Sequence, residues 1–195
     1  HMTWKSLDTA EIIAHIASRA NGSLSNTGDT DRPCRSSVHV IMSHFENPAA
    51  GMNRERFAAY VRGLRDESLG VGLPDGWVPA TKYILLVNDE GDYVGIFNLR
   101  HRLTDFLRNG PGHIGYGVAR EYRGHGYATA GLKLTLAKAR ELGIEEAYLS
   151  VHKTNPASLA VQQHCGARID HEDKTEYYTR IATCTESDGL YARGD

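Results

Sequence analysis

Hydrophobic residues follow a helical spacing in the first part of the chain. Asp8 and Glu11 have the spacing of a capping box, and isoleucines then recur on one face, so we predict a helix that reaches about Ala20. Residues 21–37 are rich in Asn, Gly, Ser, Thr and Asp without any period and predict a loop. Asn53 can cap a second helix. Its apolar positions recur at intervals of three and four residues: Phe57, Tyr60, Val61 and Leu64.

The spacing becomes strand-like after a turn-rich segment at 70–79. Apolar runs at 83–87 and 93–99 flank a short polar turn and predict a β-hairpin. After the polar interval 104–112, residues 113–118 predict a third strand, which contains two glycines. Glycine inside a strand usually marks a bulge or a place where another backbone comes close.

Helices and strands then alternate to the end of the pattern. Apolar residues at intervals of three and four predict a helix from about Ala128 to Leu142, and Gly143 follows where a helix often ends. The remaining predicted elements are a strand at 147–151, a helix at 155–165 that ends at Gly166, and a strand at 175–181. This order predicts one α/β domain, followed by a tail at 182–195.

The composition restricts the function. The chain has 195 residues, with 22 Lys and Arg against 24 Asp and Glu, a net charge of −2 and 41% hydrophobic residues. This near-neutral balance predicts neither nucleic acid nor an anionic membrane as a partner. No apolar run approaches the ~20 residues that span a bilayer, and the first nine residues lack the pattern of a signal peptide.

The cysteines and histidines predict no metal site. The three cysteines, Cys34, Cys165 and Cys184, are an odd number without a Cys-x-x-Cys pair, which favours a reduced cytoplasmic setting. The ten histidines are scattered and contain no His-Glu-x-x-His motif. We therefore expect a cytoplasmic protein without a metal, in which Cys165 beside Gly166 is a packed thiol at a helix end.

The segment from Arg123 to Ala128 lies between the glycine-containing strand and the next helix. A helix N-terminus presents unpaired N–H groups, and glycines before it allow the backbone to surround an anion, so we predict a phosphate or pyrophosphate site. A P-loop is excluded because no Gly-Lys-Ser/Thr sequence closes the loop. A dinucleotide-binding loop fits poorly, because Thr129 replaces a Gly or Ala and His152 replaces an acidic residue.

The third kind of anion-binding loop is the pyrophosphate loop for coenzyme A. Residues 77–168 resemble the GNAT superfamily of N-acetyltransferases, whose loop has the pattern Arg/Gln-x-x-Gly-x-Gly/Ala, and Arg123, Gly126 and Ala128 match it. The resemblance implies an α/β fold with a mixed, mostly antiparallel sheet, helices on both faces and splayed central strands. It also implies acetyl-CoA as the co-substrate and direct transfer of the acetyl group to an amine.

The resemblance places acetyl-CoA against the loop, the strand before it and a later helix. We expect the pantetheine arm to pair beside Val118, and Asn155 and Ser158 to contact the cofactor from their helix. A backbone N–H near the middle of the strand can stabilise the oxyanion that develops when the amine attacks. The loop residues expected to bind the cofactor are Arg123, Gly124, His125, Gly126, Tyr127 and Ala128.

The reaction needs a base for the ammonium and a proton donor for the thiolate. The usual donor in the family is a tyrosine, and aligning Asn155 and Ser158 puts Gln162 at its position. Water or another tyrosine, such as Tyr116, is the alternative donor. His113 is the candidate base, because it begins the glycine-containing strand and a histidine pKa near 6.5 suits proton transfer at neutral pH. A surface histidine at a strand end is the competing interpretation.

We therefore predict an acetyl-CoA-dependent N-acetyltransferase, in which residues 77–181 bind the co-substrate and residues 1–76 provide the acceptor side. The acceptor is a primary amine of a small molecule or a protein, and the loops at 21–37 and 101–112 are its expected walls. A non-catalytic acyl-CoA sensor, motivated by Gln162, and a nucleotide-binding protein are the alternatives. The open sheet edge is compatible with a homodimer.

Overall fold

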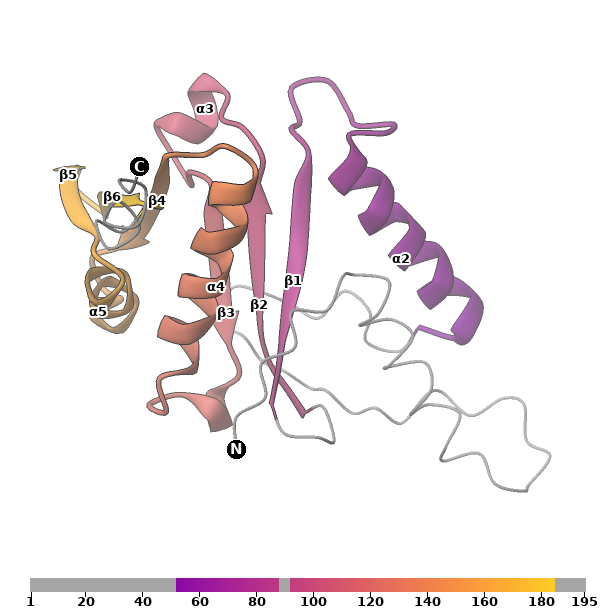
Figure 1. Ribbon diagram of the computed structural model, residues 1–195, viewed down its shortest axis with the longest axis horizontal. Coiled ribbons are helices and arrows are strands. Elements are labelled where there is room, and N and C mark those ends of the chain that lie inside the picture. Colours follow the sequence, from indigo (N-terminus) through magenta and orange to yellow (C-terminus); the bar gives the residue numbers. More distant parts are fainter. Residues whose placement is uncertain (1–51, 88–91, 185–195) are drawn as a thin grey trace, which may run out of the picture.

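The computed structural model describes residues 52–87 and 92–184. In chain order its elements are α2 (Arg54–Leu69), β1 (Ala80–Val87), β2 (Asp92–Arg100), α3 (Asp105–Arg108), β3 (Ile114–Val118), the 3-10 helix η1 (Arg120–Tyr122), α4 (Tyr127–Glu141), β4 (Glu146–His152), α5 (Pro156–His164), β5 (Arg168–Glu172) and β6 (Glu176–Ala182) (Figure 1). The helix predicted from Asp8 to Ala20, the loop 21–37 and the tail beyond 184 lie outside the described residues.

The strands form two three-stranded sheets, with the orders β1-β2-β3 and β4-β6-β5. Every strand pair in the described residues is antiparallel. The sheets meet at the bridge between Gly112 and Leu149, and β3 and β4 form no ladder beyond it in the part of the chain that is described. The predicted α/β class is confirmed, and the splay between the central strands divides the antiparallel sheet in two.

The junction between the sheets requires a glycine. Gly112 has a φ of 68°, and a Cβ atom there would overlap the carbonyl oxygen of Tyr148. The next residue, His113, donates its backbone N–H to the same carbonyl at 2.6 Å. Only glycine combines this backbone conformation with so close an approach of another strand.

Helices cover both faces of the first sheet, because successive side chains of a strand point to opposite faces. On β2, Phe97 lies under α4, where its ring approaches Gly131 so closely that no side chain fits between them. On β1, Lys82 points to the other face and pairs with Glu67 of α2 at 2.7 Å. Figure 1 shows α4 and α2 flanking this sheet, as the sequence predicts for helices on both faces.

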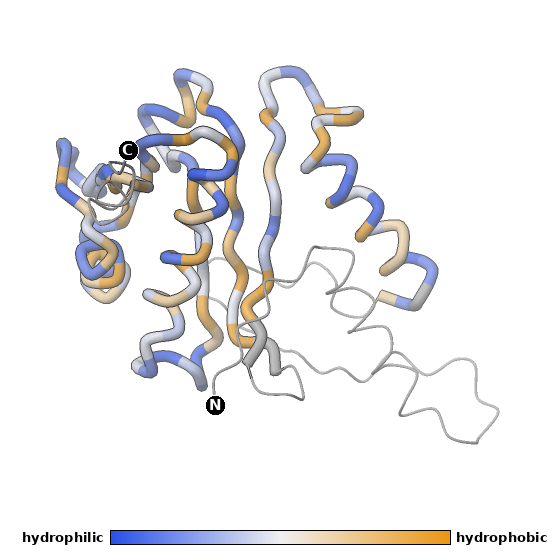
Figure 2. The backbone as a smooth tube through the Cα atoms, in the orientation of Figure 1, coloured by the Kyte–Doolittle hydropathy of each residue, from blue (hydrophilic) through white to orange (hydrophobic). Residues whose placement is uncertain are grey.

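The main hydrophobic core lies between α4 and the two sheets, where hydrophobic residues gather along the strands (Figure 2). Its buried members are Leu85, Val94, Phe97, Leu99, Ile114, Val118, Leu132, Leu136, Ala139, Ala147, Leu149 and Ile181. Within residues 52–87 and 92–184, no helix combines the length and apolar character needed to cross a membrane.

Most predicted elements are confirmed, but the pattern does not predict α3 or β5. α3 has only four residues, with Thr104 as its N-cap, so it is too short to show a period. β5 is exposed along its whole length, so no alternation of apolar and polar residues marks it. β5 exists because of its neighbour, since it adds to the edge of β6 by backbone pairing.

The two glycines of β3 do not mark a bulge, which is one of the two features that the sequence predicts for them. Gly115 and Gly117 pair in regular register with Asn98 and Ile96 of β2. Tyr116 lies between them and stacks on Phe97, with 5.6 Å between the ring centroids, so it points toward α4. The glycines therefore face the opposite side, where β3 presents no side chain of its own at these positions.

Candidate active site

The loop between η1 and α4 has a backbone conformation that suits an anion. Gly124 and Gly126 have φ values of 79° and 80°, in the left-handed region that favours glycine. Gly126 is the N-cap of α4, and no side chain caps the helix there. The N–H groups of Tyr127, Ala128 and Thr129 begin the helix and therefore have no acceptor within it. These groups and the positive end of the helix dipole favour a bound phosphate.

Arg123 and two tyrosines hold this loop in place. Nε of Arg123 donates to the carbonyl of Val118 at 3.0 Å, which fastens the loop to the end of β3. The ring of Tyr127 lies 6.1 Å from that of Tyr122 in an edge-to-face arrangement and 6.2 Å from that of His125. Arg123 and His125 are exposed, so both remain accessible to a ligand.

One edge of β3 bonds to β2, and its other edge faces the gap toward β4. Ala119 donates its N–H to β2 at 2.8 Å, and the carbonyl of His113 accepts from β2 at 2.8 Å. In an antiparallel ladder alternate residues bond to the same partner, so the N–H groups of Tyr116 and Val118 point to the other edge. Two backbone donors thus line the gap that opens where β4 diverges, beside the loop.

The hydroxyl of Tyr116 reaches α5 across the gap. It lies 2.9 Å from Oγ of Ser158 and donates to the Ser158 carbonyl at 3.2 Å. Burial raises the pKa of Tyr116, and the hydrogen bond to Ser158 opposes this shift in part. At neutral pH the phenol is therefore protonated.

The start of α5 is built as the sequence predicts. Oδ1 of Asn155 accepts from the N–H of Ser158 at 3.1 Å and caps the helix. Gln162, at the position of the family's tyrosine, is only 1% exposed, and its Oε1 accepts from the hydroxyl of Thr179 at 2.6 Å. The side-chain amide of Gln162 thus joins α5 to β6 within the core. The phenol that lies near this part of α5 is that of Tyr116.

His113 lies at the opposite end of β3 from the loop and is 7% exposed. Its Nδ1 accepts the backbone N–H of Tyr148 at 3.0 Å. Burial, and then the charges of Arg108, Arg100 and Arg180, lower the pKa of His113 to about 4. The structure therefore argues against its predicted role as general base, because the only lone pair of the neutral ring is already engaged.

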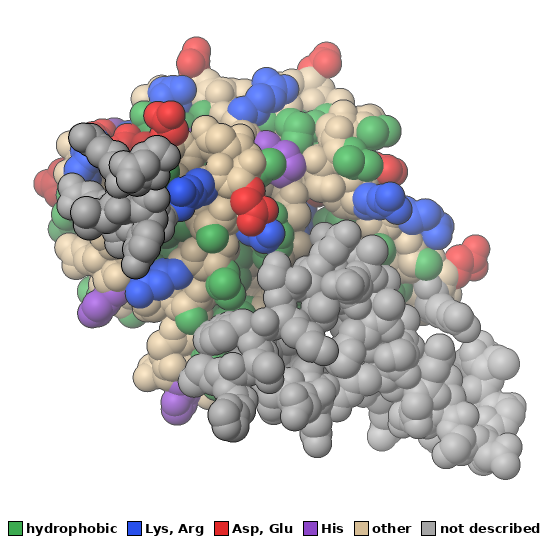
Figure 3. Space-filling view, in the orientation of Figure 1, with side chains coloured by type: hydrophobic (Ala, Val, Ile, Leu, Met, Phe, Trp, Pro, Cys, Tyr) green, Lys and Arg blue, Asp and Glu red, His purple; other side chains and the backbone are tan. Residues whose placement is uncertain are grey.

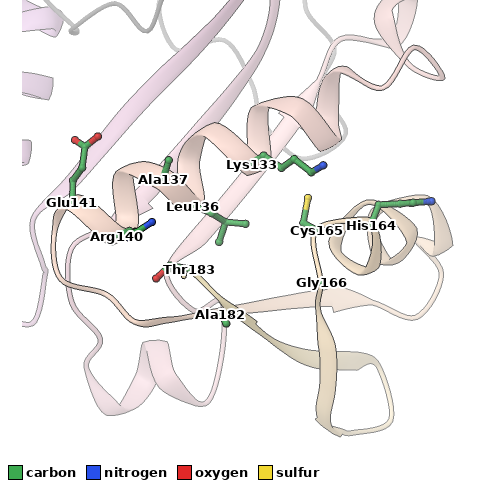
Figure 4. Close-up of a pocket in the computed structure, with 10 residues that line it drawn as sticks. All are labelled: Lys133, Leu136, Ala137, Arg140, Glu141, His164, Cys165, Gly166, Ala182 and Thr183. Atoms are coloured by element: carbon green, nitrogen blue, oxygen red, sulfur yellow. The ribbon is translucent and has the colours of Figure 1, made fainter. Parts of the chain in front are cut away.

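A groove runs between α4 and α5. It has a volume of about 920 Å³ along the outer side of α4, and Lys133, His164 and Cys165 line it (Figure 4). A second hollow of about 500 Å³ shares Lys133 and His164 and reaches Gly126. The thiol of Cys165 donates to the carbonyl of Thr129 at 3.6 Å, so it is the packed helix-end thiol that the sequence predicts.

Lys133 and His164 are candidate site residues that the sequence interpretation misses. A signal exists for Lys133, since Gly126, Thr129, Ala130 and Lys133 recur at the i, i+3, i+4 and i+7 positions of one helix face. No such signal exists for His164, because the α4 residues that share the groove with it are distant in the sequence. Nδ1 of His164 is bound to the carbonyl of Ala160 at 2.7 Å, which leaves Nε2 available.

On the face in Figure 3, basic and acidic side chains are interspersed over the described residues. No group of three or more His, Cys, Asp and Glu residues within 52–87 and 92–184 is arranged to hold a metal ion.

Comparison with known proteins agrees with this geometry. The family profile described as an acetyltransferase (GNAT) domain matches residues 39–168, which are 130 of the 195 residues. A search of the curated proteins finds no match to the sequence.

Solved structures share the fold at low sequence identity. A variant of spermidine N-acetyltransferase SpeG from Vibrio cholerae has a TM-score of 0.50 and 14% identity, with 93% of this chain and 95% of that chain covered. Apo FdhC, described as a nucleotide-linked sugar GNAT, has a TM-score of 0.50 and 16% identity, with 97% of this chain and 92% of that chain covered. With the family profile, the loop before α4 and the splayed sheets, these findings lead to one conclusion: the chain belongs to the GNAT family of N-acetyltransferases.

Proposed function

We propose that the protein transfers the acetyl group of acetyl-CoA directly to a primary amine. The observation that carries the proposal is the anion-binding loop at one end of the open edge of β3. The loop offers backbone N–H groups to phosphates, and the edge offers the N–H groups of Tyr116 and Val118 to an extended arm that contains amides. A pyrophosphate joined to a pantetheine arm matches both features.

The groove between α4 and α5 is our candidate site for the nucleotide end of acetyl-CoA. The second hollow continues from it to Gly126 beside the loop, and Lys133 and His164, which line both, add basic side chains. Coenzyme A carries a 3′-phosphate on its ribose, and a lysine and a histidine are suitable partners for it. Arg123, His125 and Tyr127 remain the proposed contacts with the pyrophosphate.

The acetyl group is expected near the middle of β3. The lone pair of the amine attacks the thioester carbonyl, and the N–H of Tyr116 stabilises the negative charge on the carbonyl oxygen. The carbon–nitrogen bond forms, the carbon–sulfur bond breaks and the nitrogen loses one proton. The thiolate takes up one proton, so the products are an acetamide and coenzyme A with a free thiol.

Tyr116 is the proposed proton donor to the thiolate. Its phenol is half-buried, points toward α5 and keeps its proton at neutral pH because burial raises its pKa. Ser158 and Asn155 hold this end of α5 in position. Since the lone pair of His113 is engaged, the proposal assigns the proton of the amine to solvent.

The alternative of a non-catalytic acyl-CoA sensor was motivated by Gln162. That residue is bonded to Thr179 in the core, and the phenol of Tyr116 lies close by, so the missing tyrosine on α5 is no sign of lost chemistry.

A binding assay followed by a turnover assay tests the proposal. Coenzyme A, ATP and NAD are each added in excess, and a true ligand raises the melting temperature by mass action. We expect a shift with coenzyme A alone. Acetyl-CoA is then incubated with polyamines, amino acids, amino sugars, aminoglycosides and peptide N-termini, and release of the free thiol is measured. A shift with ATP or NAD alone contradicts the proposal, and a coenzyme A shift without thiol release for any amine indicates a sensor.

A further inference from the structure

Three arginines from three different elements converge where the two sheets meet. Arg180 of β6 lies over the ring of Tyr148, with 3.7 Å from its guanidinium carbon to the ring centroid. Arg108 of α3 donates to the hydroxyl of the same tyrosine at 3.3 Å. Arg100 of β2 donates to the carbonyl of Gly112 at 3.1 Å. We call these residues, with His113, the junction cluster.

The positive charge of the junction cluster is only partly balanced by carboxylates. Arg180 donates to the carbonyl of Thr179 at 3.0 Å and pairs with Asp170 at 3.1 Å, but Asp170 also binds Arg168 and His171. No carboxylate in the described residues pairs with Arg108. The structure therefore keeps an excess of cationic donors in one partly buried place, which is costly unless an anion binds there.

Glu67, the carboxylate whose charge acts on Arg100, is similarly engaged. It is bound to Lys82 at 2.7 Å, so its charge is shared between two cations. Burial lowers the pKa of Arg100, and Glu67 opposes this shift. Glu67 therefore does not provide a dedicated partner for the arginine.

His113 adds a neutral donor to the cluster. Its Nδ1 accepts from Tyr148, so the ring proton is on Nε2, for which the described residues provide no acceptor. Burial and the three arginine charges keep the ring neutral at physiological pH by lowering its pKa to about 4. The free polar groups of the junction cluster are thus all hydrogen-bond donors. Such a group of donors is suited to bind an anion.

The cluster lies on the acceptor side of the proposed reaction centre. α3 and η1 lie at opposite ends of β3 (Figure 1), so the cluster is at the far end of the strand from the pyrophosphate loop. His113, Gly115 and Gly117 alternate along the same face of β3, and the glycines leave this face open between the cluster and the middle of the strand. From His113 to Gly115 the strand advances about 6.6 Å.

From this geometry we infer that the acceptor amine carries an anionic group, a carboxylate or a phosphate, which Arg100, Arg108, Arg180 and Nε2–H of His113 bind. The inference rests on the proposed acetyl transfer and adds the substrate class. With the amine beside Gly115, next to the N–H of Tyr116, the amine and the anionic group are separated by about 6–7 Å. A polyamine lacks the anionic group and places further positive charge beside three arginines.

The same cluster also favours the reactive form of the acceptor. Cations near an ammonium group lower its pKa, as they lower that of His113. A larger fraction of the amine is then unprotonated at neutral pH. The unprotonated amine can attack without a side-chain base beside it, and the proton that it loses goes to solvent as proposed above.

Matched substrate pairs test the inference. The first pair is 5-aminopentanoate and 5-aminopentanamide, which differ only in the negative charge. The second pair, 4-aminobutyl phosphate and 4-aminobutanol, distinguishes phosphate from carboxylate, and spermidine is the polyamine. We expect kcat/KM to be at least tenfold higher for one anionic amine than for its neutral partner, corresponding to about 1.4 kcal/mol.

Arg108→Gln is the variant of choice, because Arg108 is exposed and its loss does not disturb the core. It should reduce the ratio of kcat/KM between the anionic and the neutral amine to about one third or less. Arg65→Gln on α2 is the matched control, because it removes an exposed arginine outside the cluster and should leave this ratio unchanged.

Binding of the acetylated products provides a readout that does not require turnover. Calorimetry in the presence of coenzyme A compares the affinities of 5-acetamidopentanoate and 5-acetamidopentanamide. The N-acetylated forms of 4-aminobutyl phosphate and 4-aminobutanol are compared in the same way. A preference for the anion that Arg108→Gln reduces supports the inference, even if no amine is acetylated and the proposed function fails. Equal rates and equal binding within both pairs, or a preference for spermidine, overturn the inference while thiol release still supports acetyl transfer.

Discussion

The hydroxyl of Tyr116 on β3 lies 2.9 Å from the hydroxyl of Ser158 on α5, although the residues are 42 positions apart. This contact brings a phenol to the helix on which the family usually places its tyrosine. Gln162, the residue at that position, is bonded to Thr179 in the core. Tyr116, which belongs to a strand, therefore places its phenol close to the position where the family usually has a tyrosine on the helix.

Tyr116→Phe is expected to lower kcat by about 100-fold, because general acid catalysis typically contributes 10²–10⁴-fold. KM for acetyl-CoA should change little, since the ring still stacks on Phe97. Steady-state kinetics measure both values. Tyr178→Phe removes a phenol bonded to Asp173 away from the gap and serves as the control. Equal kcat for Tyr116→Phe and the unmodified protein would remove Tyr116 from the chemistry.

Gly126→Ala is expected to weaken binding of coenzyme A about tenfold. The φ of 80° at Gly126 disfavours any other residue by about 1–2 kcal/mol, so the loop must shift. Gly143 at the other end of α4 has a φ of 77° and equally open surroundings. Gly143→Ala therefore imposes the same strain without touching the loop. Calorimetry should show weaker binding for Gly126→Ala only, and equal affinities for both variants would contradict the assigned site.

Gly112→Ala is expected to destabilise the fold by about 3 kcal/mol or more, because a clash adds to backbone strain. A Cβ atom at Gly112 overlaps the carbonyl of Tyr148, where the two sheets meet. Gly72 has nearly the same φ, 66° against 68°, but no atom within 4 Å of its Cβ position. Gly72→Ala should therefore cost only about 1–2 kcal/mol. Denaturant unfolding measures both costs, and similar values would mean that the junction tolerates a side chain.

The free energy of unfolding should fall as the pH is lowered from 6.5 to 4. These limits are the ordinary pKa of histidine and the pKa of about 4 that His113 has in the folded protein. In this interval the unfolded chain binds a proton at His113 that the folded chain excludes, so the free energy of unfolding rises with pH. The full contribution is present above 6.5, and the loss reaches about 3 kcal/mol near pH 4. Three cations face the ring from β2, α3 and β6: Arg100, Arg108 and Arg180.

His113→Gln isolates this contribution, because glutamine can still accept the N–H of Tyr148 but does not titrate. Unfolding free energies measured between pH 4 and 7.5 should depend less on pH in this variant. His125→Gln removes an exposed histidine and is the control. If the pH dependence of His113→Gln matches that of the unmodified protein, the cluster does not hold the ring neutral.

The sequence by itself determined the elements and the loop whose causes are local. Asn53 and Asn155 cap their helices with side chains that reach three residues along the chain. Gly126 and Gly143 flank α4 because a positive φ favours glycine at these positions. Capping, periodicity and φ depend on neighbouring residues, so the pattern alone predicts α4 and the backbone of the loop before it.

The tertiary structure alone decided which distant side chains meet. The bond between His113 and Tyr148 spans 35 positions and occupies the ring nitrogen that a base would use. The arginines around them come from β2, α3 and β6, and β5 exists through pairing with β6. These features depend on topology and burial, because the charge environment of a ring and the pairing of a polar strand are set by elements far away in the sequence.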